Sequence, residues 1–223
     1  MTGTDAAARA GVLPLARRAV AYEAAMWRCL YRWVFRRPAG LEPGAEAFGY
    51  TGVVLPILMI FIILSTVEIP LLDLILRHVL PWDGVRVAAL ALGVYGVLWM
   101  VGLLAMLRVN PHVVGPAGLR VRNGASIDLV LPWDAVTAVR KRYRALPSNK
   151  SVQFEGEGAG RVLVLGLGGQ TSVDVVLGRP MVVPLPKAGG EPVGELRIYA
   201  DDPDALVAKA RTWLTAPPPD GAG

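Results

Sequence analysis

The sequence predicts a membrane-embedded α-helical hairpin followed by a mostly β domain that ends in a C-terminal capping helix. Apolar residues make up 53% of the 223-residue chain and charged residues 18%, a composition too apolar for a soluble domain. The apolar residues are concentrated in two stretches, since residues 38–76 contain no Lys or Arg and residues 87–107 contain no charged residue. From His112 onward, apolar and polar residues alternate with the period of β-strands.

These patterns divide the chain into four parts. We expect a cytoplasmic amphipathic N-terminal segment over residues 1–48, a two-helix transmembrane hairpin over 49–108, a β domain over 109–216 and a tail over 217–223.

The N-terminal segment predicts an amphipathic helix over residues 13–35. Its apolar residues recur at helical spacing, and Arg28, Arg32 and Arg36 lie on another side. Its Trp, Tyr and Phe residues are the types that settle at the level of lipid headgroups, so we expect the helix to lie on the cytoplasmic membrane surface. Packing of a soluble helix on the β domain is the alternative.

The apolar stretch over residues 50–76 exceeds the ~20 residues that one span requires. Glu68, Pro70 and Asp73 interrupt its second half. A carboxylate in the bilayer centre is costly, so Glu68 is expected near the far interface, facing the partner helix, or uncharged. Counting ~1.5 Å per residue from Tyr50 favours the far boundary of a ~30 Å core.

The second span is expected over residues 87–107. A short connection containing the turn Pro81-Trp82-Asp83-Gly84 makes the two spans antiparallel. Ala89, Gly93 and Gly96 are small residues that can let the helices approach closely.

The arginines predict the orientation. Seven precede the first span, two lie in the hairpin loop, Arg77 and Arg86, and a basic run follows the second span at Arg108, Arg120 and Arg122. The positive-inside rule then places both termini in the cytoplasm and the turn outside, as in a multi-pass protein of the inner or plasma membrane. The first apolar run begins too late in the chain for a cleavable signal peptide.

The second half predicts short strands in an antiparallel barrel or sandwich. Glycine-containing turns separate runs of alternating residues such as 119–122, 127–131, 152–155 and 173–175. Asp202 and Pro203 then predict the start of a helix whose apolar face closes against the sheet.

Two segments resemble the opening of bacterial pleckstrin-homology-like (PH-like) domains. These are residues 118–124, Gly-Leu-Arg-Val-Arg-Asn-Gly, and the later run Leu131-Pro132-Trp133-Asp134. In that family two membrane helices often precede the domain. The resemblance implies a PH-like barrel or sandwich in a membrane-tethered module that binds lipid or protein. The connection over 154–195, rich in Pro and Gly, departs from the family pattern and leaves the strand register there open.

The strongest candidate site is a basic run that can bind anionic lipid headgroups at ~1 kcal/mol per charge. Its residues are Arg140, Lys141, Arg142, Arg144 and Lys150. Strand alternation places Arg140, Arg142 and Arg144 on one face. A solvated strand face or nonspecific apposition to the membrane is the alternative.

No catalytic, metal or cofactor site is predicted, and we expect no enzyme. The only histidines, His78 and His112, lie on opposite flanks of the second span, and Cys29 is the single cysteine. The basic charge adjoins apolar spans, which favours lipid over nucleic acid as the partner.

The sequence therefore predicts a nonenzymatic membrane protein that presents a cytoplasmic PH-like domain to a protein or to anionic lipid. The expected partners are membrane lipids, a membrane or cytoplasmic protein, and further copies of the chain. The alternative is a small transport or permeation subunit in which Glu68 or Asp73 lines a path through an oligomer.

Overall fold

The structure, a computed structural model, describes residues 3–37, 40–79, 82–185 and 190–215. The chain forms two compact units. Residues 1–38 and 57–109 make up a helical unit, and residues 39–56 and 110–223 make up a β unit. The segment between the first two helices therefore belongs to the β unit, although the sequence places its first part with the N-terminal segment.

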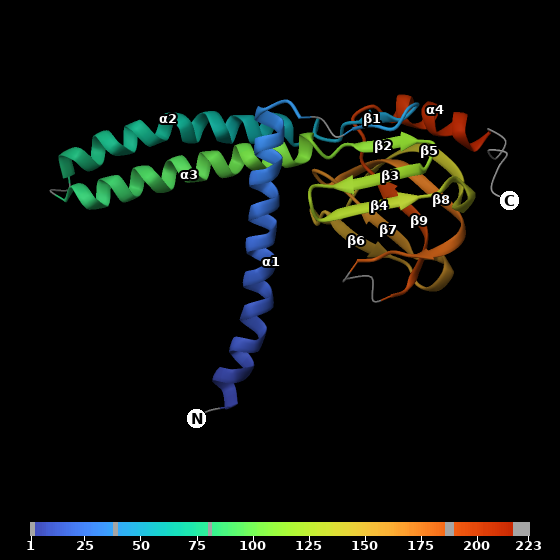
Figure 1. Cartoon of the computed structure of the whole chain (residues 1–223), viewed down its shortest axis with the longest axis horizontal. Coiled ribbons are helices and arrows are strands. Elements are labelled where there is room, and N and C mark those ends of the chain that lie inside the picture. The colour runs from blue at the N-terminus through green and yellow to red at the C-terminus, as the bar shows by residue number, and fades with distance from the viewer. Residues whose placement is uncertain (1–2, 38–39, 80–81, 186–189, 216–223) are drawn as a thin grey trace. The chain divides into compact units, whose positions relative to one another are not determined.

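The helical unit contains three long helices (Figure 1). They are α1 (Gly3–Val34), α2 (Leu55–Val79) and α3 (Asp83–Arg108). The expected N-terminal helix exists and begins ten residues earlier than its predicted start at residue 13. It ends at Val34, and Arg36 just beyond it has a positive φ of 47°, which a continuing helix does not allow.

Helices α2 and α3 are long and apolar enough to cross a membrane, with mean hydropathies of 2.3 and 2.2. This confirms the two apolar helices of the predicted hairpin. None of the residues of α2 is buried in the protein, and the helix continues through Pro70. Of the predicted turn, Pro81 lies outside the described residues, while Trp82 is exposed and Asp83 already begins α3.

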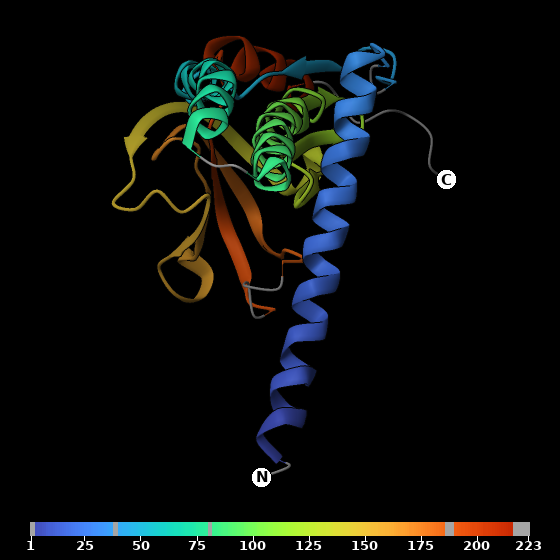
Figure 2. The same cartoon turned by 90° about the vertical axis from the view of Figure 1, so that its left-hand side faces the viewer.

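Two glycines of α3 mark close contacts within the helical unit. A Cβ atom on Gly93 would lie 2.9 Å from Cγ1 of Ile69 in α2, and one on Gly102 would lie 3.0 Å from Cγ of Met26 in α1. Small residues thus allow helix approach, as expected at Gly93, whereas a Cβ on Gly96 would meet no atom within 4 Å. Helix α1 crosses the direction of the hairpin in Figure 1, and Figure 2 shows that it lies on the α3 side of the hairpin.

The first sheet of the β unit is antiparallel, in the order β1-β2-β3-β4. Its strands are β1 (Glu46–Phe48), β2 (His112–Gly115), β3 (Gly118–Asn123) and β4 (Ile127–Leu131). Strand β1 is an unpredicted edge strand that pairs Phe48 with His112. The first strand of the domain therefore comes from the segment that precedes the spans.

The second sheet has five strands in the order β5-β8-β9-β7-β6. They are β5 (Val136–Ala145), β6 (Val152–Glu155), β7 (Val162–Leu165), β8 (Gln170–Val182) and β9 (Pro192–Ile198), with short 3₁₀ turns at Trp133–Ala135 and Gly158–Gly160. Strands β7 and β9 pair in parallel, so the expectation of a wholly antiparallel arrangement is wrong for this pair. The described strands form two open sheets and do not close into a barrel.

One hydrophobic core joins both sheets and the last helix, α4 (Pro203–Leu214). Alternate residues of β3 and β4 point into this core, as their period predicted. Leu206, Val207 and Ala210 bring α4 onto it. The side chain of Asp202 caps α4 by accepting a hydrogen bond from the N–H of Ala205 at 2.9 Å, which is the expected start of the helix.

The Gly118 and Pro132-Trp133 segments have structural roles. Gly118 has φ 132°, and a Cβ there would lie 2.2 Å from the carbonyl oxygen of Leu131, so only glycine fits. The indole N–H of Trp133 donates to the carbonyl of Gly115 at 2.8 Å. Together they fix the turn between β2 and β3 against the end of β4.

Candidate functional site

The predicted basic run lies on β5 and in the loop after it. Asp204 of α4 accepts a hydrogen bond from Lys141 at 2.6 Å, which raises the pKa of this lysine. Asp174 of β8 accepts one from Arg144 at 2.9 Å and raises the pKa of that arginine. Two of the five predicted cations are therefore already neutralised by carboxylates of the same unit.

The other three cations are exposed. Arg140, Arg142 and Lys150 make no ion pair with any residue that the structure describes. The pairing of β5 with β8 shifts register between Lys141 and Arg144, which interrupts the strict alternation expected for the three arginines. Arg140 and Arg142 remain available to an anionic ligand, whereas Arg144 is partly withdrawn toward a buried aspartate.

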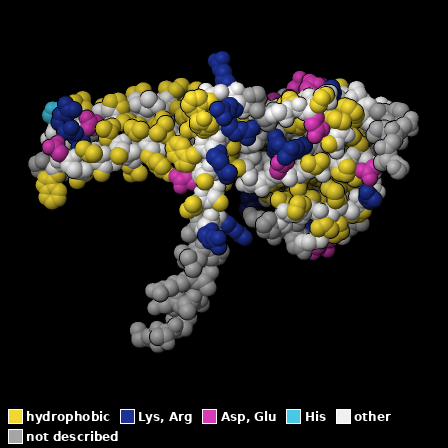
Figure 3. Space-filling view, in the orientation of Figure 1, with side chains coloured by type: hydrophobic (Ala, Val, Ile, Leu, Met, Phe, Trp, Pro, Cys, Tyr) yellow, Lys and Arg dark blue, Asp and Glu magenta, His cyan; other side chains and the backbone are white. Residues whose placement is uncertain are grey.

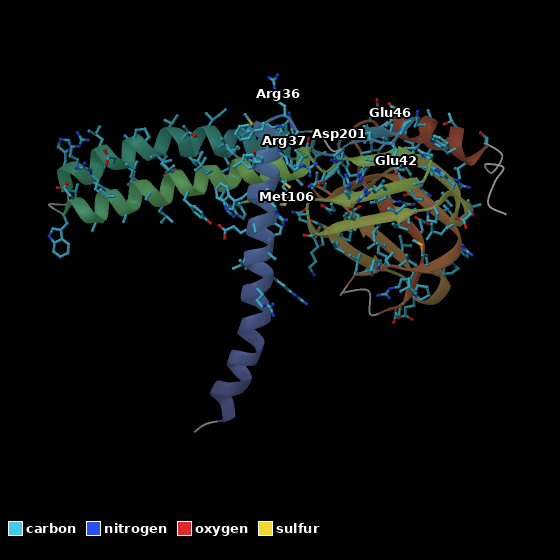
Figure 4. The ribbon with its side chains drawn as sticks, viewed as in Figure 1. Arg36, Arg37, Glu42, Glu46, Met106 and Asp201 are labelled. Atoms are coloured by element: carbon cyan, nitrogen blue, oxygen red, sulfur yellow. The ribbon has the colours of Figure 1, made fainter. Side chains whose placement is uncertain are left out.

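The β unit also contains a polar clasp that sequence reasoning missed, formed by Gly49, Thr51, Gly52 and Asp201. The carboxylate of Asp201, labelled in Figure 4, accepts hydrogen bonds from the backbone N–H of Thr51 at 3.0 Å and of Gly52 at 2.7 Å. The N–H of Asp201 donates to the carbonyl of Gly49 at 2.9 Å. The clasp therefore binds the segment that precedes α2 to the loop that precedes α4.

His112 continues this attachment into the core of the β unit. Its Nδ1 accepts from the N–H of Arg122, so the neutral ring donates from Nε2 to the carbonyl of Tyr199 at 2.9 Å. The ring of Tyr50 stacks on it at 4.8 Å. Burial lowers the pKa of His112 from 6.5 to about 4, which makes its role structural at neutral pH.

A groove of about 420 Å³ runs between α2 and α3 inside the helical unit. Most of its lining is apolar, and its polar side chains are Ser65, Glu68, Asp73 and Arg86. Figure 3 shows hydrophobic side chains over most of the visible surface of these helices, with charged groups gathered at the end that carries the turn. The groove brings together Glu68 and Asp73, the two predicted intramembrane carboxylates.

Asp73 is an ion-pair partner within this groove. Its carboxylate lies 3.2 Å from Arg77 of the same helix and 3.0 Å from Arg86 of α3. Arg86 also contacts Asp83 at 3.0 Å. The ion pair between Asp73 and Arg86 depends on the packing of α2 against α3, so it could not be predicted from the sequence alone.

Glu68 differs from Asp73 in having no partner. It makes no hydrogen bond or ion pair with any residue in the described part of the chain. Helix α2 begins at Leu55, and Glu68 lies ~20 Å from that residue along the helix axis. Of the expected situations of Glu68, the structure shows the one in which its side chain faces the partner helix, in the groove between α2 and α3.

Helix α1 packs on α3 through Met26 and Cys29, which contact Met106. The hydroxyl of Tyr95 in α3 donates to the carboxylate of Glu23, beside the ring of Trp27. Arginines line the rest of this helix (Figure 3). Those whose side chains are described, Arg17, Arg18, Arg28, Arg32, Arg36 and Arg37, form no ion pair with described residues. The predicted amphipathic character is therefore present, with the packed side on α3.

Within the described ranges, no group of three His, Cys, Asp or Glu side chains is placed to hold a metal ion. Comparison of the chain with protein-family models, with curated proteins and with solved structures gives no match.

Proposed function

We propose that this protein is a nonenzymatic integral membrane protein whose two-span hairpin holds a β domain at the inner face of the plasma membrane for interaction with a protein or with anionic lipid. Both termini are cytoplasmic in this proposal, and the turn between the spans is outside. The arginines before the first span and after the second support that orientation.

The observation that carries the proposal is that both segments joining α2 and α3 to the core of the β unit are short. Tyr50 and His112 are 2% and 3% exposed in the β unit. Only residues 51–54 link Tyr50 to α2, and only residues 109–111 link α3 to His112. At ~3.6 Å per residue these connections reach at most ~18 Å, so a β domain attached to membrane spans in this way has no long tether.

The exposed apolar surface of α2 and α3 supports the membrane part of the proposal. Helix α2 has no buried residue, and large apolar side chains along both helices are exposed. Exposed apolar surface of this extent is unfavourable in water and is the normal outer surface of a membrane helix.

A PH-like fold is the architecture that we propose for the β domain. Its support is the order of elements, with strands in two sheets around one core and a final helix that packs on that core. The added strand β1 and the parallel pair β7–β9 depart from the expected layout. The binding surface that we propose contains Arg140, Arg142 and Lys150, which carry unneutralised charge.

Alkaline carbonate extraction of cell membranes tests the integral-membrane assignment. The full chain should remain in the pellet. Replacing both Ile60 and Leu98 by Arg puts charges on exposed apolar positions of the spans, at a cost of ~3 kcal/mol each, and should reduce membrane retention. The matched control is Leu41→Arg, an exposed apolar position of the β unit. Release of the unaltered chain by carbonate would contradict the proposal.

The transport alternative keeps one observation in its favour, the unpartnered Glu68 in the groove. Asp73 no longer supports it, because Arg77 and Arg86 already neutralise that carboxylate. A conducting oligomer would lose activity in Glu68→Gln, whereas a scaffold would not.

A further inference from the structure

Glu68 is an exposed carboxyl side chain with apolar neighbours and with no hydrogen-bond or ion-pair partner among the described residues. It lines the groove between α2 and α3 together with residues such as Ile69, Leu72 and Leu90. A carboxylate within the hydrocarbon region of a membrane costs a few kcal/mol or more unless a positive or hydrogen-bonding group meets it. The described residues supply no such group.

The other charges of the groove cannot compensate for Glu68. Among the residues that the structure describes, Arg86 is the one cation lining the groove, and it is engaged by Asp73 and Asp83. Glu68 also lies five residues from Asp73, about 7 Å along the helix axis. The carboxyl group of Glu68 therefore has no cation beside it among the described residues, and it lies away from the ion pairs at the turn.

The space beside this charge has the size of a small-molecule site. The volume of about 420 Å³ falls within the range of known ligand pockets. Gly96 contributes to that space, since a Cβ atom there would meet nothing within 4 Å. At Gly93, by contrast, Ile69 closes the gap between the helices. Ile69 thus bounds the open part of the groove on the side of Gly93.

We propose that the groove between α2 and α3 binds a lipophilic organic cation, with the positive group against Glu68 and the apolar body against the helix side chains. Charge complementarity selects the cation, and the apolar lining selects a hydrophobic molecule over a hydrated metal ion. The proposal concerns the helical unit alone. It holds or fails independently of what the β domain binds.

Tetraphenylphosphonium is a suitable probe, because tetraphenylborate has the same shape and the opposite charge. The full chain is reconstituted in nanodiscs of zwitterionic phosphatidylcholine, and binding of the labelled cation is measured at equilibrium. We expect saturable binding of the cation and none of the anion. Glu68→Gln should weaken binding of the cation by about tenfold or more, because it removes the carboxylate that attracts the cation in the apolar groove.

Two further variants separate loss of the site from loss of the fold. Glu68→Asp keeps the carboxylate and should retain most of the binding. Gly96→Leu fills the open space and should weaken binding although Glu68 is intact, whereas its matched control Val94→Leu adds bulk at a position of α3 that does not line the groove. The proposal is overturned if the unaltered chain shows no saturable binding, if Glu68→Gln binds as tightly, or if tetraphenylborate binds equally well.

Discussion

The carboxylate of Asp201 accepts a hydrogen bond from the backbone N–H of Gly52 at 2.7 Å, although the two residues are 149 positions apart in the sequence. The close approach also requires a glycine, since a Cβ atom on Gly52 would lie 2.8 Å from Oδ1 of Asp201. This pair fixes the chain three residues before α2 begins.

Replacing Asp201 by Ala should loosen the segment before α2. Two charge-assisted hydrogen bonds are lost, and because the site is partly exposed we expect the cost to be about 2 kcal/mol. Hydrogen exchange at the amides of Thr51 and Gly52 should accelerate accordingly. Asp204→Asn is the control, since Asp204 is exposed and its ion pair is with Lys141 of β5. Unchanged protection in Asp201→Ala would show that the clasp does not hold the segment.

The stability of the β unit should fall as the pH drops from about 6.5 to about 4. His112 has its pKa lowered to about 4 by burial, so the folded state binds fewer protons than the unfolded state in this window. Stability from this group is complete above pH 6.5 and falls by about 3 kcal/mol at pH 4, since each unit of pKa shift is ~1.4 kcal/mol.

Urea unfolding followed by tryptophan fluorescence across this pH range measures the effect. His112→Gln should be less stable at neutral pH and should lose much of the slope between pH 6.5 and 4. His78→Gln replaces the other histidine, which is exposed on α2, and should leave the slope unchanged. An equal slope in His112→Gln would assign the pH dependence to other groups.

Anionic ligands should distinguish the free from the paired cations of β5. Replacing both Arg140 and Arg142 by Gln should weaken binding of soluble inositol hexakisphosphate by about 2 kcal/mol, roughly 30-fold, at ~1 kcal/mol per charge. Replacing Lys141 and Arg144 should have a smaller effect, because carboxylates already neutralise them. Equal effects of the two pairs would contradict a site built on Arg140 and Arg142.

Gly102→Leu should displace α1 from α3. A side chain at this position would overlap Met26, the fully buried residue of the contact. Cys29 is 7% exposed beside Met26 and is the only cysteine, so its rate of maleimide labelling reports release of the helix. Gly96→Ala, on the same helix with open space around it, is the control. If the two variants label equally slowly, the contact at Gly102 does not hold α1.

The sequence predicted those helices and strands in which apolar and polar residues follow a regular local pattern. The charge-free run over residues 87–107 lies within α3, and the alternation at Leu119 and Val121 marks two core residues of β3. The capped start of α4 at Asp202 was equally readable, because a cap depends on three neighbouring residues.

The rest depends on contacts between distant segments. Strand β1 has three residues and acquires its pairing from β2, which follows it by more than sixty residues. The parallel pairing of β7 with β9 and the ion pair of Asp73 with Arg86 likewise need the tertiary fold. For the same reason the sequence suggested Glu68 as a candidate but could not show that a groove surrounds it.

Labelling of single cysteines from outside intact cells tests the proposed orientation of the hairpin. In a Cys29→Ser background, cysteines are placed at Asp83, beside the turn between the spans, and at Ser148, in the loop after β5. The proposal predicts that position 83 reacts with a membrane-impermeant maleimide and that position 148 reacts only after the cells are opened. Labelling of position 148 in intact cells would place the β domain outside and contradict its proposed role at the inner face of the membrane.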